Sequence, residues 1–538
     1  MLPKLFFIIV SIILTHSYSQ CLDHEKRLLL QLKNDLIFNS STSTKLVQWN
    51  QRDECCKWNG VECDAAGYVV GLQLDHEAIS GGIEDSSSLF RLMHLQKINL
   101  AYNDLSSDPI PKGIHNLTYL THLNLSNAGF GGQLPAEILS MKKLASLDIS
   151  SEYSSLSLEH PNLEMLVRNL TRLTELSLDG ASISSNESRK WSHIISSYLP
   201  NITLLSLRFC SLSGPLANSF WQLHSLSILQ LDSNDLSTLV PDLFANFRRL
   251  NTLSLVGCSL NGSFPNKIFQ IPTLRILDLS YNTLSGSISP LAQTGSLESM
   301  VLKWNNLSGS IPTSISNLRN LSKIDLSHCQ LTGSIPPTLA RLTQLIHVDL
   351  SFNLLTGPLS STLFEGLSNL AYLNMDSNSF SGDIPHSLLG LPSMSRLHLN
   401  NNKFSGVIPI VNVSKMVLLD LSGNQLEGPI PDSLFQFHSL EYLTLSNNSL
   451  NGSFVLDKLT RLANLTHLGL SRNNLSVYGG NHSWSSQLQE VGLASCNLHA
   501  FPDFIKHSPL TELDLSNNRI AGEIPSWIWG TQLKELKL

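Results

Sequence analysis

Leucine residues return along this chain in one repeated frame. The pattern L-x-x-L-x-L-x-x-N/C-x-L recurs from residue 69 to the end, and most of its starts lie 22 to 25 residues apart. Its x-L-x-L-x core alternates with period two, which predicts a short strand whose leucines point inward. One such coil cannot bury its apolar face alone, but about twenty stacked coils can. We therefore predict an α/β solenoid, a right-handed superhelix with a parallel β-sheet on its concave face.

The chain is expected to cross the convex side after each strand. A Gly-x-Ile-Pro motif recurs there, for example at 309–312 and 333–336. Glycine permits the backbone bend, and proline fixes φ and offers no donor to a ladder. Two longer spacings of 29 residues, which begin at Leu144 and Leu173, are interpreted as coils with inserted loops around 151–160 and 185–193.

The ninth frame position carries a seam of asparagine and cysteine. An asparagine amide there can satisfy backbone groups that the bend after the strand leaves unpaired. Cysteine is small, tolerates burial and offers a weak S–H donor, so it can replace asparagine as a buried free thiol. Disulfides and metal sites within the seam are not expected, because the closest pair lies two coils apart, roughly 9 to 10 Å. The predicted seam residues are Asn103, Cys210, Asn234, Cys258, Asn282, Asn305, Cys329, Asn353, Asn378, Asn402, Asn424, Asn448, Asn473, Cys496 and Asn518.

Residues 20–68 are predicted to cap the first coil. The stretch 23–36 reads as an amphipathic helix opened by Asp23, which could lie over the exposed end of the stack. Trp49 and Trp58 are expected to fill the join between this helix and the solenoid, which occupies residues 69–538.

The remaining four cysteines fall in this cap and allow three pairings. Bonding the neighbours Cys55 and Cys56 to each other would strain the peptide. This leaves Cys21–Cys55 with Cys56–Cys63, or the crossed alternative, and the first is preferred because its second loop is short and closes locally. No C-x2-C pair or nearby histidine completes a zinc site, so we expect no metal.

The first 19 residues are predicted to be a signal peptide. Lys4 precedes the apolar run LFFIIVSIIL, and Ser17 and Ser19 are the small residues that cleavage requires. The alternative is an N-terminal anchor that stays attached. No later stretch has 18 consecutive apolar residues, so the chain as given is expected to leave the cell unanchored. Fifteen Asn-x-Ser/Thr acceptors agree with export. They are Asn39, Asn116, Asn124, Asn169, Asn186, Asn201, Asn261, Asn306, Asn320, Asn412, Asn447, Asn451, Asn464, Asn474 and Asn481.

Composition argues against nucleic-acid binding and catalysis. The net charge is −7 and only 14% of residues are charged, so the chain carries no broad basic field. The motifs G-x-S-x-G, H-E-x-x-H, the P-loop and G-x-G-x-x-G are absent. The aspartates and serines of the LDLS segments follow the repeat rather than gathering in a pocket. We therefore expect no enzyme and no cofactor.

Aromatic and basic residues gather at exposed strand positions in the middle of the solenoid. The eighth frame position carries Tyr281, Trp304, His328 and Phe352, and the third carries Lys323, His347, Tyr372 and Arg396, then Tyr442 and His467 after Leu418. These residue types dominate binding hot spots. The hypothesis is that this patch contacts a protein, a peptide or an acidic saccharide, and that binding tightens as His328 and His347 become protonated. The alternative is that the side chains only cover the strand edge.

Several stretches resemble a known family. CCKWNGVECD with the upstream cysteine and helix is similar to the N-terminal cap of plant extracellular leucine-rich-repeat proteins, and the L-x-G-x-I-P coils resemble the plant-specific repeat class. CLDHEKRLLLQLKNDL, HLNLSNAGFGGQLP and IPSWIWG are similar to receptor-like proteins of the Verticillium-wilt-resistance type.

This resemblance implies a cell-surface immune receptor. Its leucine-rich ectodomain would sense a pathogen-derived or cell-wall ligand, span the plasma membrane once and signal through partner receptor kinases. The sequence departs from that pattern, because it shows no second membrane segment, no tail and no C-terminal cap after LKELKL. The rival interpretation is a soluble apoplastic binding or inhibitor protein, or a truncated product. Such inhibitors, however, resemble a shorter array of about ten coils closed by a cysteine cap.

Overall fold

A computed structural model describes residues 20–105, 108–151, 155–237, 242–291, 295–410, 415–479, 487–530 and 532–538. The chain forms two compact units, Met1–Leu212 with Ala217–Leu223 (unit 1) and Ser213–Leu216 with His224–Leu538 (unit 2), and each is described by itself. The signal-peptide prediction for residues 1–19 and the acceptors Asn412 and Asn481 lie outside the described residues.

Each unit is built on a ladder of short strands, one for each coil. The main sheet of unit 1 starts with an antiparallel pair, β2 and β3, and continues in parallel from β3. Its strands are β2 (Val61–Cys63), β3 (Val69–Gln73), β5 (Lys97–Asn99), β6 (His122–Asn124), β8 (Ser146–Asp148), β10 (Glu175–Ser177) and β12 (Leu204–Ser206).

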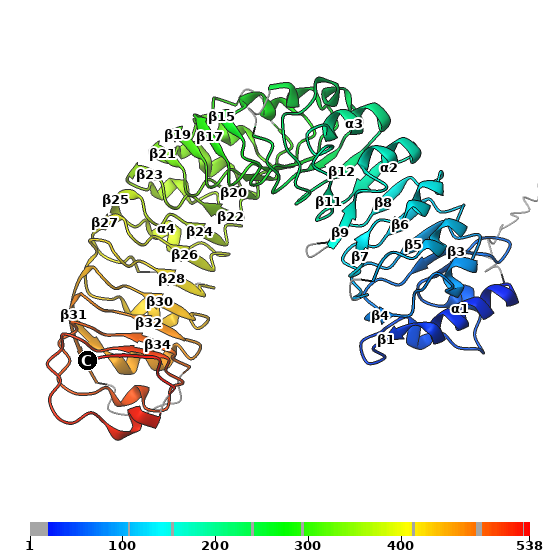
Figure 1. Ribbon diagram of the computed structural model, residues 1–538. Helices are drawn as coiled ribbons and strands as arrows, with labels where there is room; N and C mark the ends of the chain where they lie inside the picture. The colour runs from blue at the N-terminus through cyan, green and yellow to red at the C-terminus, as the bar shows by residue number, and fades with distance from the viewer. Residues whose placement is uncertain are drawn as a thin grey trace, which may run out of the picture. The chain divides into compact units, whose positions relative to one another are not determined.

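The main sheet of unit 2 is parallel and in register from strand to strand. The central residue of each strand is apolar and buried, apart from an intermediate burial at the last strand, as the period-two pattern predicts. Its strands are β13 (Ile228–Gln230), β14 (Thr252–Ser254), β16 (Ile276–Asp278), β18 (Ser299–Val301), β20 (Lys323–Asp325), β22 (His347–Asp349), β24 (Tyr372–Asn374), β26 (Arg396–His398), β28 (Leu418–Asp420), β30 (Tyr442–Thr444), β32 (His467–Gly469), β34 (Glu490–Gly492), β35 (Glu512–Asp514) and β36 (Glu535–Lys537). The predicted α/β solenoid with a parallel sheet is confirmed (Figure 1).

A second set of strands follows the seam, and the repeat frame does not predict it. Some of these strands end in the glycine of a Gly-x-Ile-Pro motif, as β19 does at Gly309 and β21 at Gly333, whose φ values of 77 and 76° favour glycine. They are β7 (Gly131–Gln133), β9 (Ser155–Leu158) and β11 (Ser182–Ile183) in unit 1, and β15 (Asn261–Ser263), β17 (Thr283–Gly286), β19 (Asn306–Gly309), β21 (Gln330–Gly333), β23 (Leu354–Gly357), β25 (Ser379–Asp383), β27 (Lys403–Ser405), β29 (Glu427–Gly428), β31 (Ser449–Val455) and β33 (Asn474–Tyr478) in unit 2. A short antiparallel pair, β1 (Ile37–Phe38) with β4 (Ile79–Gly81), joins the cap to unit 1.

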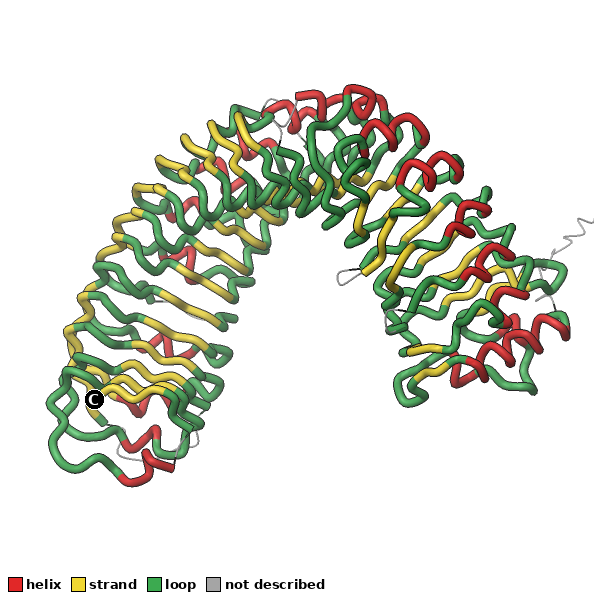
Figure 2. The backbone as a smooth tube through the Cα atoms, viewed as in Figure 1, coloured by secondary structure: helices red, strands yellow, loops and turns green. Residues whose placement is uncertain are grey.

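Short helices connect the strands on the side away from the main sheet (Figure 2). Most are short 3₁₀ helices that follow a proline, as η9 follows Pro312 and η10 follows Pro336. They are η1 (Leu46–Gln48), η2 (Cys55–Lys57), η3 (Ser88–Arg91), η4 (Lys112–Asn116), η5 (Ala136–Ser140), η6 (Asn218–Gln222), η7 (Asp242–Asn246), η8 (Asn266–Gln270), η9 (Thr313–Asn317), η10 (Pro337–Arg341), η11 (Ser361–Leu363), η12 (Asp432–Gln436), η13 (Leu456–Arg461), η14 (Asp503–Ile505) and η15 (Ser526–Gly530), with the four-residue α4 (His386–Leu389).

The two long coils of unit 1 contain α-helices, which the interpretation as inserted loops around 151–160 and 185–193 did not include. α2 (Leu163–Asn169) begins after Asn162, whose side chain accepts a hydrogen bond from the Met165 N–H. α3 (Trp191–Tyr198) buries Trp191 completely. The extra residues lengthen the connecting segment enough to close a full α-helical turn with an apolar face.

The asparagine seam works by hydrogen bonds in both directions. Asn282 Nδ2 donates to the carbonyls of Leu255 in the preceding coil and Leu279 in its own coil, at 2.8 and 3.0 Å. Its Oδ1 accepts from the N–H groups of Cys258 and Leu260 at 3.0 and 2.9 Å. Each amide therefore closes the turn of one coil and fastens it to the coil before.

Cysteine takes over only part of this function. The Cys258 thiol donates to the carbonyl of Leu231 in the preceding coil, with an S to O distance of 3.1 Å. Cys210, Cys258, Cys329 and Cys496 are all buried free thiols. Burial raises the pKa of Cys329 to about 11 and that of Cys258 to about 12, which keeps the reactive thiolate scarce.

The first coil replaces the seam amide with a glutamate that the frame does not predict. Glu77 is fully buried and accepts hydrogen bonds from the Ser43 hydroxyl and from the N–H groups of Thr44, Lys45 and Leu46. Burial alone would raise the pKa of Glu77, but the hydrogen bonds from Ser43 and the backbone outweigh it and hold the pKa below its ordinary value. This carboxylate thus fastens the cap to the first coil.

The cap covers the start of unit 1. α1 runs over Asp23–Asp35, so the helix predicted for 23–36 is confirmed and begins at Asp23; the residue before it, Leu22, makes no side-chain cap hydrogen bond. Trp49 and Trp58 are buried, and their rings stack with centroids 5.3 Å apart.

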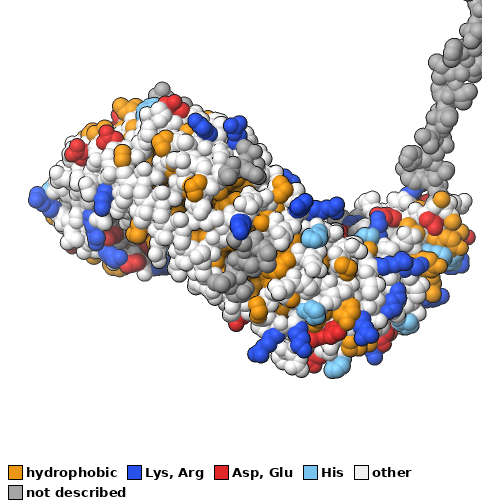
Figure 3. Space-filling view, turned by 90° about the horizontal axis from the view of Figure 1, so that it is seen from above, with side chains coloured by type: hydrophobic (Ala, Val, Ile, Leu, Met, Phe, Trp, Pro, Cys, Tyr) orange, Lys and Arg blue, Asp and Glu red, His pale blue; other side chains and the backbone are white. Residues whose placement is uncertain are grey.

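Two disulfides hold the cap. They join Cys21 to Cys55 and Cys56 to Cys63, the pairing preferred from the sequence. Within the part of the chain that the structure describes, no helix is both long and apolar enough to cross a membrane. The face shown in Figure 3 consists mainly of uncharged side chains among scattered charged ones, in line with the charged fraction of 14%.

Candidate ligand-binding surface

The aromatic residues predicted at the eighth frame position lie together in unit 2 as a stack of rings. They are Tyr281, Trp304, His328 and Phe352, here called the ring column. Successive ring centroids lie 5.9, 3.9 and 4.2 Å apart, with interplanar angles of 10 to 12°. The coil repeat therefore places one ring on the next, because each occupies the same point of its turn.

The ring column sits on a backbone conformation that does not favour large side chains. Its four residues have φ values between 52 and 56°, in the left-handed region that is unfavourable for non-glycine residues by about 1–2 kcal/mol. Ring stacking contributes about 0.5–1.5 kcal/mol per pair, which is similar in size. Other coils of unit 2 use smaller or polar residues at this position, namely Ser233, Gly257, Ser377, Asn401, Gly423, Asn447, Arg472, Ser495 and Asn517. The turn itself therefore does not require aromatic rings.

The rings remain open to solvent. Tyr281 is 51% exposed, Trp304 47% and Phe352 46%, and Leu354, two residues after Phe352, is 59% exposed. A contiguous apolar surface of this kind is typical of an interaction site.

The predicted residues at the third frame position form a second row on the main sheet. Lys323, His347, Tyr372, Arg396 and Tyr442, here called the inner column, begin strands β20, β22, β24, β26 and β30. The strands pair in register, so Lys323 lies opposite His347, which lies opposite Tyr372, which lies opposite Arg396. The rings of His347 and Tyr372 stack with centroids 4.1 Å apart. The interruption by Leu418 is also present, since β28 lies between β26 and β30.

Two cations of the inner column form no ion pair with the residues that the structure describes. Lys323 and Arg396 are exposed, and no ion pair joins either of them to a carboxylate of the described chain. By contrast, Lys303 lies 3.4 Å from the carboxylate of Asp325. Lys323 and Arg396 are therefore available to bind an anionic group.

Neighbouring carboxylates are engaged within the sheet. Asp349 accepts hydrogen bonds from the N–H and hydroxyl of Ser351 at 3.0 and 2.6 Å, and from the Tyr372 hydroxyl at 3.4 Å. Burial raises the pKa of Tyr372, and the charge of Asp349 raises it further, so this phenol stays neutral.

Two histidines of this surface, His347 and His398, have a lowered pKa in the free protein. Burial lowers the pKa of His347, and the positive charge of Lys323 lowers it further. Burial also lowers the pKa of His398, which begins no strand but ends β26. A bound carboxylate would oppose this effect, because it favours the charged imidazolium.

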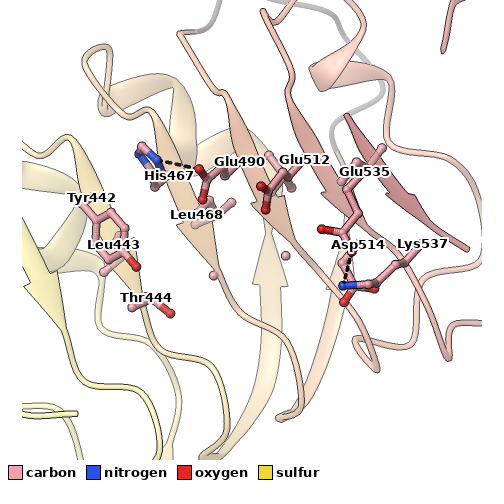
Figure 4. A pocket seen from close by; sticks show the side chains of 14 residues that line it. Tyr442, Leu443, Thr444, His467, Leu468, Glu490, Glu512, Asp514, Glu535 and Lys537 are labelled. Carbon is pink, nitrogen blue, oxygen red and sulfur yellow. Dashed lines mark ion pairs between the residues drawn. The ribbon is translucent and has the colours of Figure 1, made fainter. Parts of the chain in front are cut away.

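A hollow at the other end of unit 2 was not predicted. It has a volume of about 240 Å³ and lies over β30, β32, β34, β35 and β36. Glycines at the fifth frame position, Gly469 and Gly492, form its floor. Glu490 and Glu512 line it in register, and Glu490 also contacts His467 at 3.2 Å (Figure 4). The sequence feature that could have predicted this hollow is the glycine at the fifth frame position in two successive coils.

Comparison with known proteins matches the repeat and its cap. The leucine rich repeat N-terminal domain family matches residues 22–64. Leucine rich repeat families match residues 343–404, and single coils at 273–293, 296–318, 320–342, 415–437 and 509–531. Receptor-like protein 6 of Arabidopsis thaliana is 34% identical over 297 residues, which are 54% of this chain and 25% of that protein. Receptor-like protein Cf-9 of Solanum pimpinellifolium is 30% identical over 235 residues, 41% of this chain and 26% of that protein.

The chain is built of leucine-rich repeats, and its sequence is similar to plant receptor-like proteins. The matched part spans about a quarter of the length of these two relatives. Among solved structures, the ectodomain of the Arabidopsis receptor kinase HAESA in complex with an extended IDA peptide hormone has a TM-score of 0.72 and 26% identity, covering 96% of this chain and 93% of that chain. The same receptor with IDA and the co-receptor SERK1 gives a TM-score of 0.67 at 25% identity, covering 96% and 94%.

Most of the described glycosylation acceptors of this chain lie on the surface. Half-buried positions are Asn116, Asn124 and Asn169, and exposed positions are Asn39, Asn186, Asn201, Asn261, Asn306, Asn320, Asn447, Asn451, Asn464 and Asn474. Asn169 is already engaged, since its Nδ2 donates to the Met165 carbonyl and its Oδ1 accepts from Lys142. In unit 2, no acceptor belongs to a described strand of the main sheet. Glycosylation at these sites stays a prediction.

Proposed function

We propose that this chain is the extracellular recognition part of a plant immune receptor-like protein. It acts without catalysis and without a cofactor, on the apoplastic side of the secretory pathway. It binds a pathogen-derived or cell-wall ligand, a protein, peptide or saccharide, on the strand face of unit 2. Where the full family architecture is present, a single membrane span anchors it and partner receptor kinases carry the signal.

One observation supports this proposal above the others. The ring column exposes aromatic surface that the fold does not need, and the inner column adds two cations without internal partners. Both surfaces lie in unit 2, on or beside its main sheet. Aromatic and arginine side chains in such a patch are the residue types that carry most binding energy. The structural neighbour HAESA binds a peptide hormone together with a co-receptor, which agrees with a ligand and a partner kinase here.

The test replaces the two columns separately in the secreted chain. Lys323→Glu with Arg396→Glu alters the inner column, and Trp304→Ser with Phe352→Ser alters the ring column. Phe209→Ser is a matched control, because Phe209 occupies the eighth frame position in unit 1, has a φ of 54° and is 59% exposed. The probes are a phage-displayed library of random peptides and oligomers of uronic acid.

The expected result is that probes bound by the unaltered chain lose at least tenfold in affinity with one or both column variants. The control variant should bind like the unaltered chain. Equal binding of all probes to all four proteins would contradict the proposal and would indicate that the rings and cations only cover the strand edge.

A further inference from the structure

Ring packing in the ring column selects the chemical class of the ligand. A saccharide that stacks on an aromatic side chain must lie against the face of a ring. Atoms in contact need a separation of about 3.5–4.0 Å, so a sugar between two rings requires a gap of about 7–8 Å. The centroids of Trp304 lie only 5.9 and 3.9 Å from its neighbours, Tyr281 and His328. Both faces of Trp304 are therefore closed to a sugar.

The exposed part of the two inner rings of the column, Trp304 and His328, is thus their edge. Trp304 remains 47% exposed although its faces are covered, so the solvent meets its C–H edge. The edge of an aromatic ring carries the positive end of its quadrupole, which favours carbonyl and carboxylate oxygens as well as aliphatic side chains. A row of such edges resembles a shallow apolar strip with a weak preference for oxygen.

The charges nearby complement the same kind of ligand. Lys323 and Arg396 are exposed and have no ion pair with the described residues, and burial and the charge of Lys323 lower the pKa of His347. The three coil steps of the ring column span roughly 14 Å at a strand spacing of about 4.8 Å. An extended polypeptide rises about 3.3–3.4 Å per residue, so four or five of its residues cover this length.

We propose that the ring column receives an extended polypeptide segment with aliphatic and acidic side chains, and that it does not bind a saccharide. This inference rests on the proposed function and narrows its ligand class. Aliphatic side chains of the segment pack on the ring edges, its backbone carbonyls face the same edges, and its carboxylates reach Lys323 or Arg396.

The experiment uses the full secreted chain and is centred on Trp304. Random peptides displayed on phage are selected on the unaltered chain, and the recovered peptides are synthesised and measured against Trp304→Ser, Trp304→Phe and Phe209→Ser. A thermal unfolding curve for each variant confirms that the chain is folded. We expect peptides with Leu, Ile or Val next to Asp or Glu, binding at least tenfold more weakly to Trp304→Ser. Trp304→Phe should recover most of the affinity, because it restores a ring edge.

Each other outcome separates this inference from the proposed function. If peptides lose affinity with Lys323→Glu and Arg396→Glu but not with Trp304→Ser, the proposed function stands and this inference is wrong. Binding of uronic acid oligomers that falls tenfold with Trp304→Ser also overturns it. If the selection recovers no peptide that distinguishes the unaltered chain from Trp304→Ser, the ring column is not a polypeptide site.

Discussion

Removing one amide from the seam should show how strongly neighbouring coils depend on each other. Asn282 is 92% buried and makes hydrogen bonds to both its own and the preceding coil. In Asn282→Ala the N–H groups of Cys258 and Leu260 lose the oxygen that accepts from them at 3.0 and 2.9 Å. A methyl group cannot replace that acceptor, and the site is too deep for water to replace it without rearrangement.

The magnitude follows from the two donors that are left unpaired. An unsatisfied buried N–H destabilises a protein by about 1–3 kcal/mol, so we expect a local loss of about 3 kcal/mol after partial relaxation. Asn282→Cys keeps a donor for the Leu255 carbonyl, as Cys258 does for the Leu231 carbonyl at 3.1 Å. Sulfur is a weak acceptor, so the loss with cysteine should be about half as large, roughly 1.5 kcal/mol.

Amide hydrogen exchange is the assay, because long repeat arrays often do not unfold in one step. A loss of about 3 kcal/mol corresponds to roughly a hundredfold faster exchange at Cys258 and Leu260, and cysteine should give about tenfold. Gln330→Ala is the control, since Gln330 is an exposed amide at the start of β21. The reasoning is refuted if exchange in Asn282→Ala stays within about threefold of the unaltered chain.

Three more predictions concern the cysteines and a histidine. Cys55→Ser should destabilise the cap more than Cys63→Ser, because the sequence separation is 34 for Cys21–Cys55 and 7 for Cys56–Cys63. The chain entropy of loop closure predicts a loss of stability of about 3.7 kcal/mol for the first disulfide and about 2.3 kcal/mol for the second. A denaturation midpoint that falls equally for both variants would contradict this prediction. Burial raises the pKa of Cys258 and of Cys496 to about 12, so neither thiol should react with iodoacetamide at pH 8 until denaturant is added. If mass spectrometry of native samples finds these cysteines alkylated, the seam is accessible to solvent and the prediction is wrong. Burial holds the pKa of His347 in the folded chain below its pKa in the unfolded chain, so the contribution of His347 to stability should be present above pH 6.5 and decline as the pH falls below 6.5. Peptide binding should tighten over the same pH range. His347→Gln should remove both effects, and identical pH profiles for the two proteins would exclude them.

The repeat frame predicted those features that every coil must satisfy. The inward leucines, the parallel sheet and the seam at Asn282 or Cys258 recur because each coil buries the same face against its neighbours. The same frame also placed the rings of Trp304 and His328 on adjacent coils, since one frame position is one place on the surface.

Features that belong to a single coil could not be read from the frame. Glu77 stands at a seam position but acts through hydrogen bonds to the cap, which lies outside the repeat. α2 needed the local signal of Asn162 before an apolar helical face, and the second strands depend on backbone pairing rather than on side-chain pattern. How the ring faces cover one another depends on side-chain rotation, which the sequence pattern does not determine.

The seam has a consequence for the way such a chain can vary over generations. Each seam amide of unit 2 from Asn282 onward fastens a coil to its predecessor through the same pair of backbone groups. A duplication or loss of one whole coil of about two dozen residues would therefore leave each junction closed and the interior intact. Such a change would alter only which exposed rings and charges become neighbours on adjacent coils. New recognition surfaces can therefore arise while the fold stays the same.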